Sequence, residues 1–84
     1  MYLEKKMNFV VYSKEGCHHC YKIKQVLELT SSKHVVYTLD KEFTKEQFYS
    51  EFGEGSTFPQ VVCDEKKIGG CVDAIKFLRE HRVF

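Results

Sequence analysis

The segment Ser13-Lys14-Glu15-Gly16-Cys17-His18-His19-Cys20 joins a predicted strand to a predicted helix. Before it, residues 8–13 (Asn-Phe-Val-Val-Tyr-Ser) are rich in aromatic and β-branched side chains, which is typical of a buried strand. After it, apolar residues recur at helical spacing at Ile23, Val26 and Leu27, while polar residues take the other faces. The sequence therefore places two cysteines between a predicted strand and the start of a predicted amphipathic helix.

The same kind of pattern predicts three further strands after the first helix. The first helix runs from about Cys20 to residues 30–32, and residues 34–39 then form a strand. This strand lies parallel to the first, because a helix separates the two. Residues 57–63 and 66–68 are two short extended runs, separated by a two-residue connection of hairpin length.

A second helix has the clearest start signal in the chain. Thr44 and Gln47 fit a capping box, and Phe43 and Phe48 occupy the two hydrophobic staple positions. The helix runs to about residue 52, and Gly53 supplies the stop.

A last helix begins at about Cys71, after Gly69-Gly70 has ended the preceding strand. Asp73 lies in its first turn. Its core side carries Ala74, Ile75, Phe77 and Leu78, and its last turn carries Arg79, His81 and Arg82. The predicted element order is βαβαββα.

The composition is typical of one small folded domain, which we expect to span residues 1–84. A chain of 84 residues buries only about 60 to 65% of its unfolded surface, which excludes two independent cores. Thirteen Lys and Arg residues are interspersed with twelve Asp and Glu residues, so no basic face suggests a nucleic-acid partner. No stretch approaches the roughly 18 apolar residues of a membrane span. We therefore expect a soluble cytoplasmic protein with no membrane partner.

The two cysteines of the quoted segment have the placement of a redox pair. At a helix start, unpaired N–H groups and the positive end of the dipole stabilise negative charge, and such sites lower the pKa of a cysteine thiol. Cys17 is the predicted nucleophile, exposed with its sulfur over these N–H groups. Cys20, one turn further in, is the predicted resolving thiol, less accessible and within disulfide reach. His18 and His19 are interpreted as solvated loop residues that add positive charge as they protonate near pH ~6.5.

Zinc is the alternative use of a Cys-x-x-Cys pair with adjacent histidines. A structural zinc site needs two more ligands, and Cys63 and Cys71 do not form a second close pair. The strand, motif and helix context favours redox chemistry, so we expect no metal. Cys63, in a predicted strand, is interpreted as a small core residue.

Over nearly its whole length, the chain resembles the glutaredoxin family. The resemblance rests on four features in the expected order: Tyr12-Ser13-Lys14, the Cys17 to Cys20 motif, Thr57-Phe58-Pro59, and Gly69-Gly70-Cys71 followed by Asp73. It implies a thioredoxin fold of the α/β class, in which three helices flank a four-stranded mixed sheet. It also implies glutathione as reductant and as part of the substrate.

The resemblance implies a glutathione site formed by Lys14, His19, Thr57, Phe58, Pro59, Gly70, Cys71, Val72 and Asp73. Lys14 would pair with the glycine carboxylate, although a solvated lysine at a strand end is an equal alternative. Phe58 would pair through its main chain with the cysteinyl part of glutathione, so its side-chain identity would be nearly free. The following Pro59, the only proline in the chain, would be cis.

The γ-glutamyl end would lie at the start of the last helix. Because Gly69 and Gly70 have no β-carbon, the backbone there could come close to the ligand. The N–H of Val72 would hold the γ-glutamyl carboxylate. Asp73 would hold the amine. The alternatives are an ordinary glycine turn and an acidic residue that complements the helix dipole. Gln47 could reach the glycine end, but its capping role already accounts for it.

Two departures from the family pattern leave substrate preference open. The family commonly has Pro-Tyr between its cysteines, and His18-His19 here removes both the proline and an aromatic edge beside glutathione. Ser56 stands where a basic residue often precedes the threonine, which weakens the hold on the glycine carboxylate.

The predicted function is reduction of protein disulfides and glutathione mixed disulfides by a monomer, as part of cellular redox homeostasis and electron transport. Its partners would be glutathione and disulfide-bonded or glutathionylated client proteins. Two alternatives remain open at this point. One is a dimer that binds an iron–sulfur cluster through Cys17 and two glutathiones, and the other is a redoxin reduced by a flavoprotein reductase.

Overall fold

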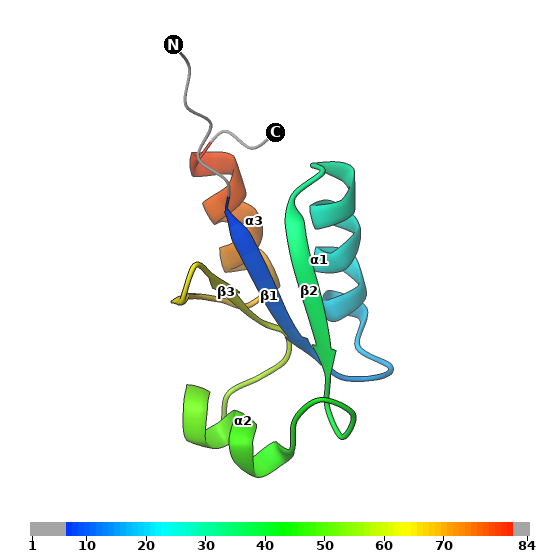
Figure 1. Ribbon diagram of the computed structural model, residues 1–84, viewed down its shortest axis with the longest axis vertical. Coiled ribbons are helices and arrows are strands. Elements are labelled where there is room, and N and C mark those ends of the chain that lie inside the picture. The colour runs from blue at the N-terminus through cyan, green and yellow to red at the C-terminus, as the bar shows by residue number, and fades with distance from the viewer. Residues whose placement is uncertain (1–6, 82–84) are drawn as a thin grey trace.

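The computed structural model describes residues 7–81, which form a four-stranded sheet and three helices (Figure 1). The elements are β1 (Asn8–Ser13), α1 (His18–Leu29), β2 (Lys33–Thr38), α2 (Lys45–Phe52), β3 (Gln60–Cys63), β4 (Lys66–Gly69) and α3 (Cys71–Glu80). This order confirms the predicted βαβαββα arrangement.

The sheet is mixed, with the strand order β2-β1-β3-β4. Strand β1 pairs in parallel with β2 and antiparallel with β3, and β4 is antiparallel to β3. The turn between β3 and β4 consists of Asp64 and Glu65, both with positive φ, as the tight two-residue hairpin turn requires. Because β1 is central, the segment that follows it emerges at the middle of one end of the sheet.

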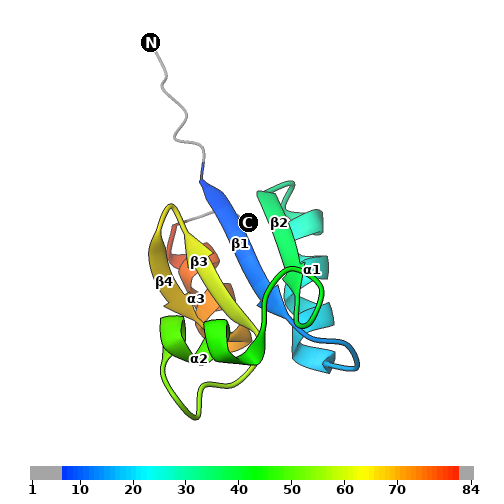
Figure 2. The ribbon, with the colours of Figure 1, turned by 60° about the horizontal axis from the view of Figure 1, so that its bottom comes forward.

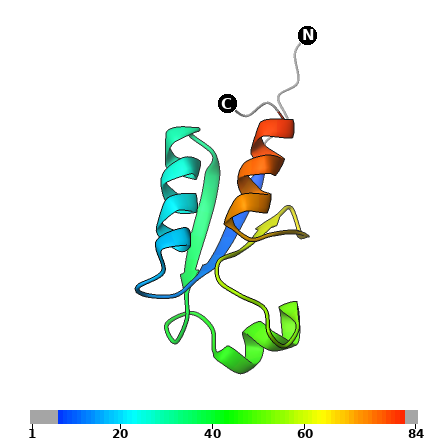
Figure 3. The ribbon, with the colours of Figure 1, turned by 180° about the vertical axis from the view of Figure 1, so that it is seen from behind.

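Helices α1 and α3 cover one face of the sheet (Figure 3). The main core lies there, where Phe9 and Val11 of β1 are buried in one cluster with Ile23, Leu27 and Leu78 of the two helices. Figure 2 shows α1 and α3 behind the sheet and α2 in front of its lower end. The three flanking helices agree with the predicted thioredoxin fold.

Helix α2 packs through aromatic side chains on the opposite face. Side chains alternate along a strand, so Tyr12, next to the buried Val11, points away from α1 and α3. Its ring makes edge contacts with Phe43, at 5.2 Å between centroids, and with Phe52 of α2, at 5.1 Å. This second apolar cluster packs α2 against the end of β1.

Several predicted boundaries differ from the observed ones. Helix α1 begins at His18, so the two histidines lie in its first turn and not in a loop. The run predicted from residue 57 becomes a strand only at Gln60, because Pro59 has no N–H to donate to a sheet. Helix α3 ends at Glu80 with His81 as its C-cap, and Arg82 lies outside the described residues.

None of the helices within residues 7–81 is long and apolar enough to cross a membrane.

Candidate active site

Cys17 is the N-cap residue of α1. The turn before it uses Gly16 at φ +73°, and Cys17 itself is extended, as N-cap residues are. Its Sγ accepts a hydrogen bond from the backbone N–H of Cys20, with 3.2 Å between the two atoms. The sulfur thus takes the place of the serine or threonine oxygen of an ordinary cap, and a charged sulfur accepts such a bond more strongly than a neutral one.

The two cysteines of the motif differ sharply in environment. Cys17 is partly exposed, whereas Cys20 is buried, with 1% of its surface accessible. Burial raises the pKa of the Cys20 thiol to about 12, and a hydrogen bond with the Cys17 side chain acts in the same direction. The more accessible thiol is therefore Cys17, as expected from sequence, and Cys20 stays protonated at neutral pH.

The chain returns to this end of the sheet at residues 57–59. The Phe58–Pro59 peptide bond is cis, as the resemblance implies. Pro59 is buried, while Thr57 is exposed and its carbonyl oxygen accepts a hydrogen bond from Gln60 Nε2 at 2.9 Å. A β-carbon on Gly70 would lie 3.5 Å from the Pro59 oxygen, so this loop lies next to the start of α3.

The side chain of Phe58 is part of an aromatic stack. Its ring stacks on that of the buried Phe48, with 4.1 Å between centroids and 10° between planes, and also on Phe43 at 6.3 Å. The ammonium group of Lys14 lies over the Phe58 ring, 5.3 Å from its centroid. The resemblance implied that the identity of the Phe58 side chain is nearly free, but it did not predict these contacts of the ring with three other residues.

The start of α3 has unpaired N–H groups. Gly70 is the N-cap residue without a side chain that could cap the helix, and the first helical hydrogen bond runs from the Ala74 N–H to the Gly70 carbonyl. The N–H groups of Cys71, Val72 and Asp73 precede this bond, so they have no partner within the helix. Val72 is 74% exposed, and Asp73 is also at the surface.

Gly69 is required by the position of Asp73. Its φ is +122°, and a β-carbon at this position would lie 2.6 Å from Asp73 Oδ2 and 2.9 Å from Asp73 Cβ. The missing side chain therefore makes room for Asp73.

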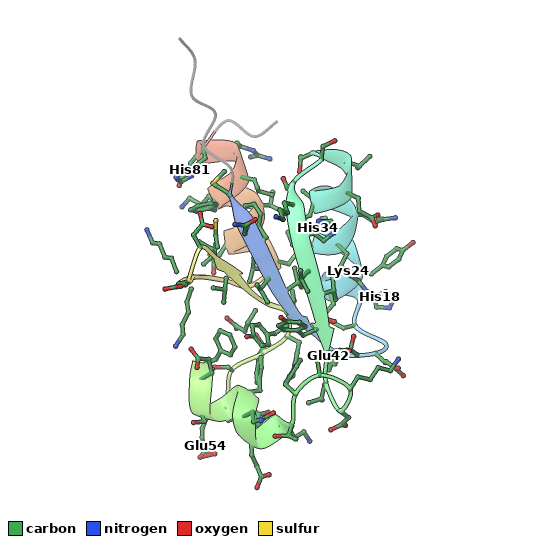
Figure 4. The ribbon with its side chains drawn as sticks, in the orientation of Figure 1. His18, Lys24, His34, Glu42, Glu54 and His81 are labelled. Carbon is green, nitrogen blue, oxygen red and sulfur yellow. The ribbon has the colours of Figure 1, made fainter. Side chains whose placement is uncertain are left out.

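Strand pairing explains why these separate segments meet. Tyr12, near the end of β1, pairs with Gln60 at the start of β3, and Val61 pairs with Gly69 at the end of β4. The cysteine motif, the cis-proline loop and the start of α3 therefore lie at one end of the sheet. Lys14 belongs to the same group through its contact with Phe58. His19 is exposed in the first turn of α1, and Figure 4 shows the neighbouring His18 projecting outward.

The two remaining cysteines are both buried. Cys71 is part of the core at the first residue of α3, and burial raises the pKa of its thiol. Cys63 is also in the core, which confirms its interpretation from sequence. It pairs with Phe9 near the start of β1, at the end of the sheet away from Cys17. Within residues 7–81, no group of three or more His, Cys, Asp or Glu side chains is arranged to hold a metal ion.

Comparison with known proteins identifies the family. The family model for glutaredoxin matches residues 9–68. Glutaredoxin 1 of Rickettsia prowazekii is 32% identical over an alignment of 80 residues, and the match covers 88% of this chain and 80% of the relative. The chain belongs to the glutaredoxin family.

Two solved glutaredoxins have the same fold. The buckwheat glutaredoxin–glutathione complex superposes with a TM-score of 0.74 at 25% identity, covering 89% of this chain and 71% of the other. Reduced Escherichia coli glutaredoxin superposes with a TM-score of 0.77 at 24% identity, covering 89% and 96%. The family and the fold are consistent with a thiol–disulfide oxidoreductase.

One set of residues packed behind this glutaredoxin's site was not predicted from the sequence. Phe48 and Phe52, four residues apart on α2, connect the cis-proline loop to Tyr12 of β1. Lys67 of β4 holds the end of α2 through Glu51, at 3.3 Å between Nζ and Oε2, and also lies over the Phe52 ring. The spacing of the two phenylalanines was the available signal, since residues four apart share one helix face.

Proposed function

We propose that this glutaredoxin is a glutathione-dependent oxidoreductase that reduces protein disulfides and glutathione mixed disulfides, with Cys17 as nucleophile and Cys20 as resolving thiol. The observation that supports it most is the hydrogen bond from the Cys20 N–H to a partly exposed Cys17 sulfur. A thiolate at this place has a donor for its charge and an open path for a substrate.

The one-cysteine route needs only Cys17. Its thiolate attacks the glutathione sulfur of a mixed disulfide, a new Cys17–glutathione disulfide forms, and the client sulfur leaves as a thiolate that takes up a proton. The thiolate of a second glutathione then attacks the glutathione sulfur on Cys17. Glutathione disulfide is released and the Cys17 thiolate is restored.

The two-cysteine route acts on protein disulfides. Cys17 attacks one sulfur of the client disulfide, and the other client sulfur leaves as a thiolate. Cys20 must then lose its proton to attack the Cys17 sulfur, which forms a Cys17–Cys20 disulfide and releases the client as a dithiol. Two glutathiones reduce this disulfide and leave as glutathione disulfide. Exchange rates depend on the fraction of attacking thiolate. Burial is the largest cause of the raised pKa of Cys20, and it disfavours the thiolate that this second step needs at neutral pH. The one-cysteine route is therefore the favoured one.

Glutathione would lie across the three segments that meet at Cys17. The main chain of Phe58 would pair with the cysteinyl part, next to Thr57 and Pro59, and Lys14 would hold the glycine carboxylate. The N–H groups of Cys71 and Val72, which have no partner within the helix, would hold the γ-glutamyl carboxylate next to Gly70, and Asp73 would hold the amine. His19 would border the ligand. The glutathione in the solved buckwheat complex supports this use of the fold.

The proposal includes a cytoplasmic monomer in which the glutathione pool keeps Cys17 and Cys20 reduced, as reducing compartments do with thiols.

The test is glutathione-dependent reduction of a small glutathione mixed disulfide by the wild type, Cys17→Ser and Cys20→Ser. We expect Cys20→Ser to retain turnover and Cys17→Ser to lose it. Full turnover by Cys17→Ser would exclude the mechanism. A parallel assay supplies a flavoprotein reductase in place of glutathione, and activity with that reductant alone would exclude glutathione dependence.

A further inference from the structure

The Phe58 ring is held in place from within the protein. Phe48, with which it stacks at 4.1 Å, is 1% exposed and also contacts Phe52 at 5.0 Å. Phe43 stacks on Phe48 at 5.8 Å and on Phe58 at 6.3 Å. The half-buried Phe58 ring is thus the outermost member of a packed aromatic group, and it has little freedom to turn.

Lys14 is the only cation over this ring among the described residues. Its side chain is exposed, and its described contact is the Phe58 ring, 5.3 Å from Nζ to the centroid. A cation over an aromatic face is attracted by the ring's quadrupole within about 6 Å. The contact restricts a long side chain that would otherwise sample many rotamers.

We propose that Phe58 is a positioning residue whose side chain holds the Lys14 ammonium group where it can bind the glycine carboxylate of glutathione. The inference rests on the proposed glutathione site. In that site the Phe58 main chain pairs with the cysteinyl residue, and the glycine residue is the next along the ligand, about 3.8 Å away between Cα atoms. An ammonium group over the Phe58 ring would therefore lie beside the glycine residue of glutathione, whose carboxylate needs a cationic partner.

The test measures binding of two unreactive probes by calorimetry. One is S-methylglutathione, and the other is its analogue with a carboxamide in place of the glycine carboxylate. We expect Phe58→Leu to weaken S-methylglutathione binding about two- to fivefold, the range that exposed cation–π contacts give. Binding of the carboxamide should not change. Phe58→Tyr, which keeps the ring, should bind like the wild type, and Phe58→Met is a second ring-free variant.

The dependence on Lys14 is the decisive comparison. Lys14→Gln should weaken S-methylglutathione binding, and adding Phe58→Leu to it should cause no further loss. Equal weakening of both probes by Phe58→Leu would mean that the ring acts through loop packing, and the inference would be wrong. An additive double variant, or an unaffected Phe58→Leu, would overturn it as well.

Phe52→Leu is the matched control, because it removes another ring of the same group that lies under a lysine, Lys67, at 5.4 Å. Both probes should bind this control like the wild type, and a selective loss of S-methylglutathione binding there would contradict the inference. If the wild type binds neither probe, the proposed use of glutathione itself is wrong. If it binds both and Phe58→Leu changes nothing, only the role of the ring is wrong.

Discussion

The backbone N–H of Cys20 donates a hydrogen bond to the sulfur of Cys17, whereas the thiol of Cys20 is itself buried. Cys20 thus stabilises the accessible sulfur of Cys17, while its own sulfur is inaccessible. We expect iodoacetamide to alkylate Cys17 near neutral pH and to leave Cys20 unmodified, because the thiolate is the reactive form and the pKa of Cys20 is about 12. Mass spectrometry of the digested protein checks this. Preferential labelling of Cys20 would reverse the assigned roles. The Cys17→Ser variant is the control, in which Cys20 should remain slow to react.

The raised pKa of Cys20 also predicts a loss of stability in alkali. The folded thiol titrates at about 12, whereas an unfolded cysteine titrates at about 8.5. Between these values the unfolded chain loses a proton that the folded chain keeps, so the free energy of unfolding falls as pH rises. Below about 8.5 the effect is absent.

Urea unfolding of the wild type and Cys20→Ala at several pH values measures this effect. The two proteins share their other titrating groups, so the stability advantage of the wild type should shrink only as pH rises above about 8.5. A difference that stays constant across this range would contradict the prediction.

Gly69→Ala should destabilise the protein strongly. The new β-carbon would lie 2.9 Å from Asp73 Cβ, which is fixed to the helix and cannot turn away, and φ is +122°. We expect a loss of about 1 to 3 kcal/mol or more in the free energy of unfolding. Gly70→Ala is the neighbouring control. Its β-carbon would meet only the Pro59 oxygen at 3.5 Å, so its cost should stay below about 1 kcal/mol. Equal losses in the two variants would contradict this explanation.

Phe48→Ala should remove the centre of the aromatic group under α2. The side chain is 1% exposed and stacks on Phe58, so we expect a loss of about 3 to 5 kcal/mol, measured by urea unfolding. Leu29→Ala is the control, since Leu29 is 85% exposed and its replacement should change stability by less than about 0.5 kcal/mol. A loss for Phe48→Ala as small as that of the control would show that α2 contributes little to the fold.

Features set by neighbouring residues were predictable. The capping box at α2 is present in both directions, with Thr44 Oγ1 accepting from the Gln47 N–H at 3.1 Å and Gln47 Oε1 accepting from the Thr44 N–H at 2.8 Å. The predicted staple is present too, as Phe43 stacks on Phe48. These contacts span at most five residues, so the local pattern carries the information.

Features that join distant segments were not predictable in the same way. Lys14 and Phe58 are far apart in the chain, and no periodicity relates them. The packing of Gly69 against Asp73 was not predicted either, because the position of the Asp73 side chain depends on how α3 packs against β4.

Periodicity, capping residues and short motifs are local properties, so they were sufficient to predict the order of the elements, the place of Cys17 at a helix start and the resemblance to glutaredoxins. The tertiary structure was needed to show what the Phe58 ring contacts and how Gly69 packs against Asp73. These depend on strand register and helix packing, which bring together side chains that local patterns do not connect.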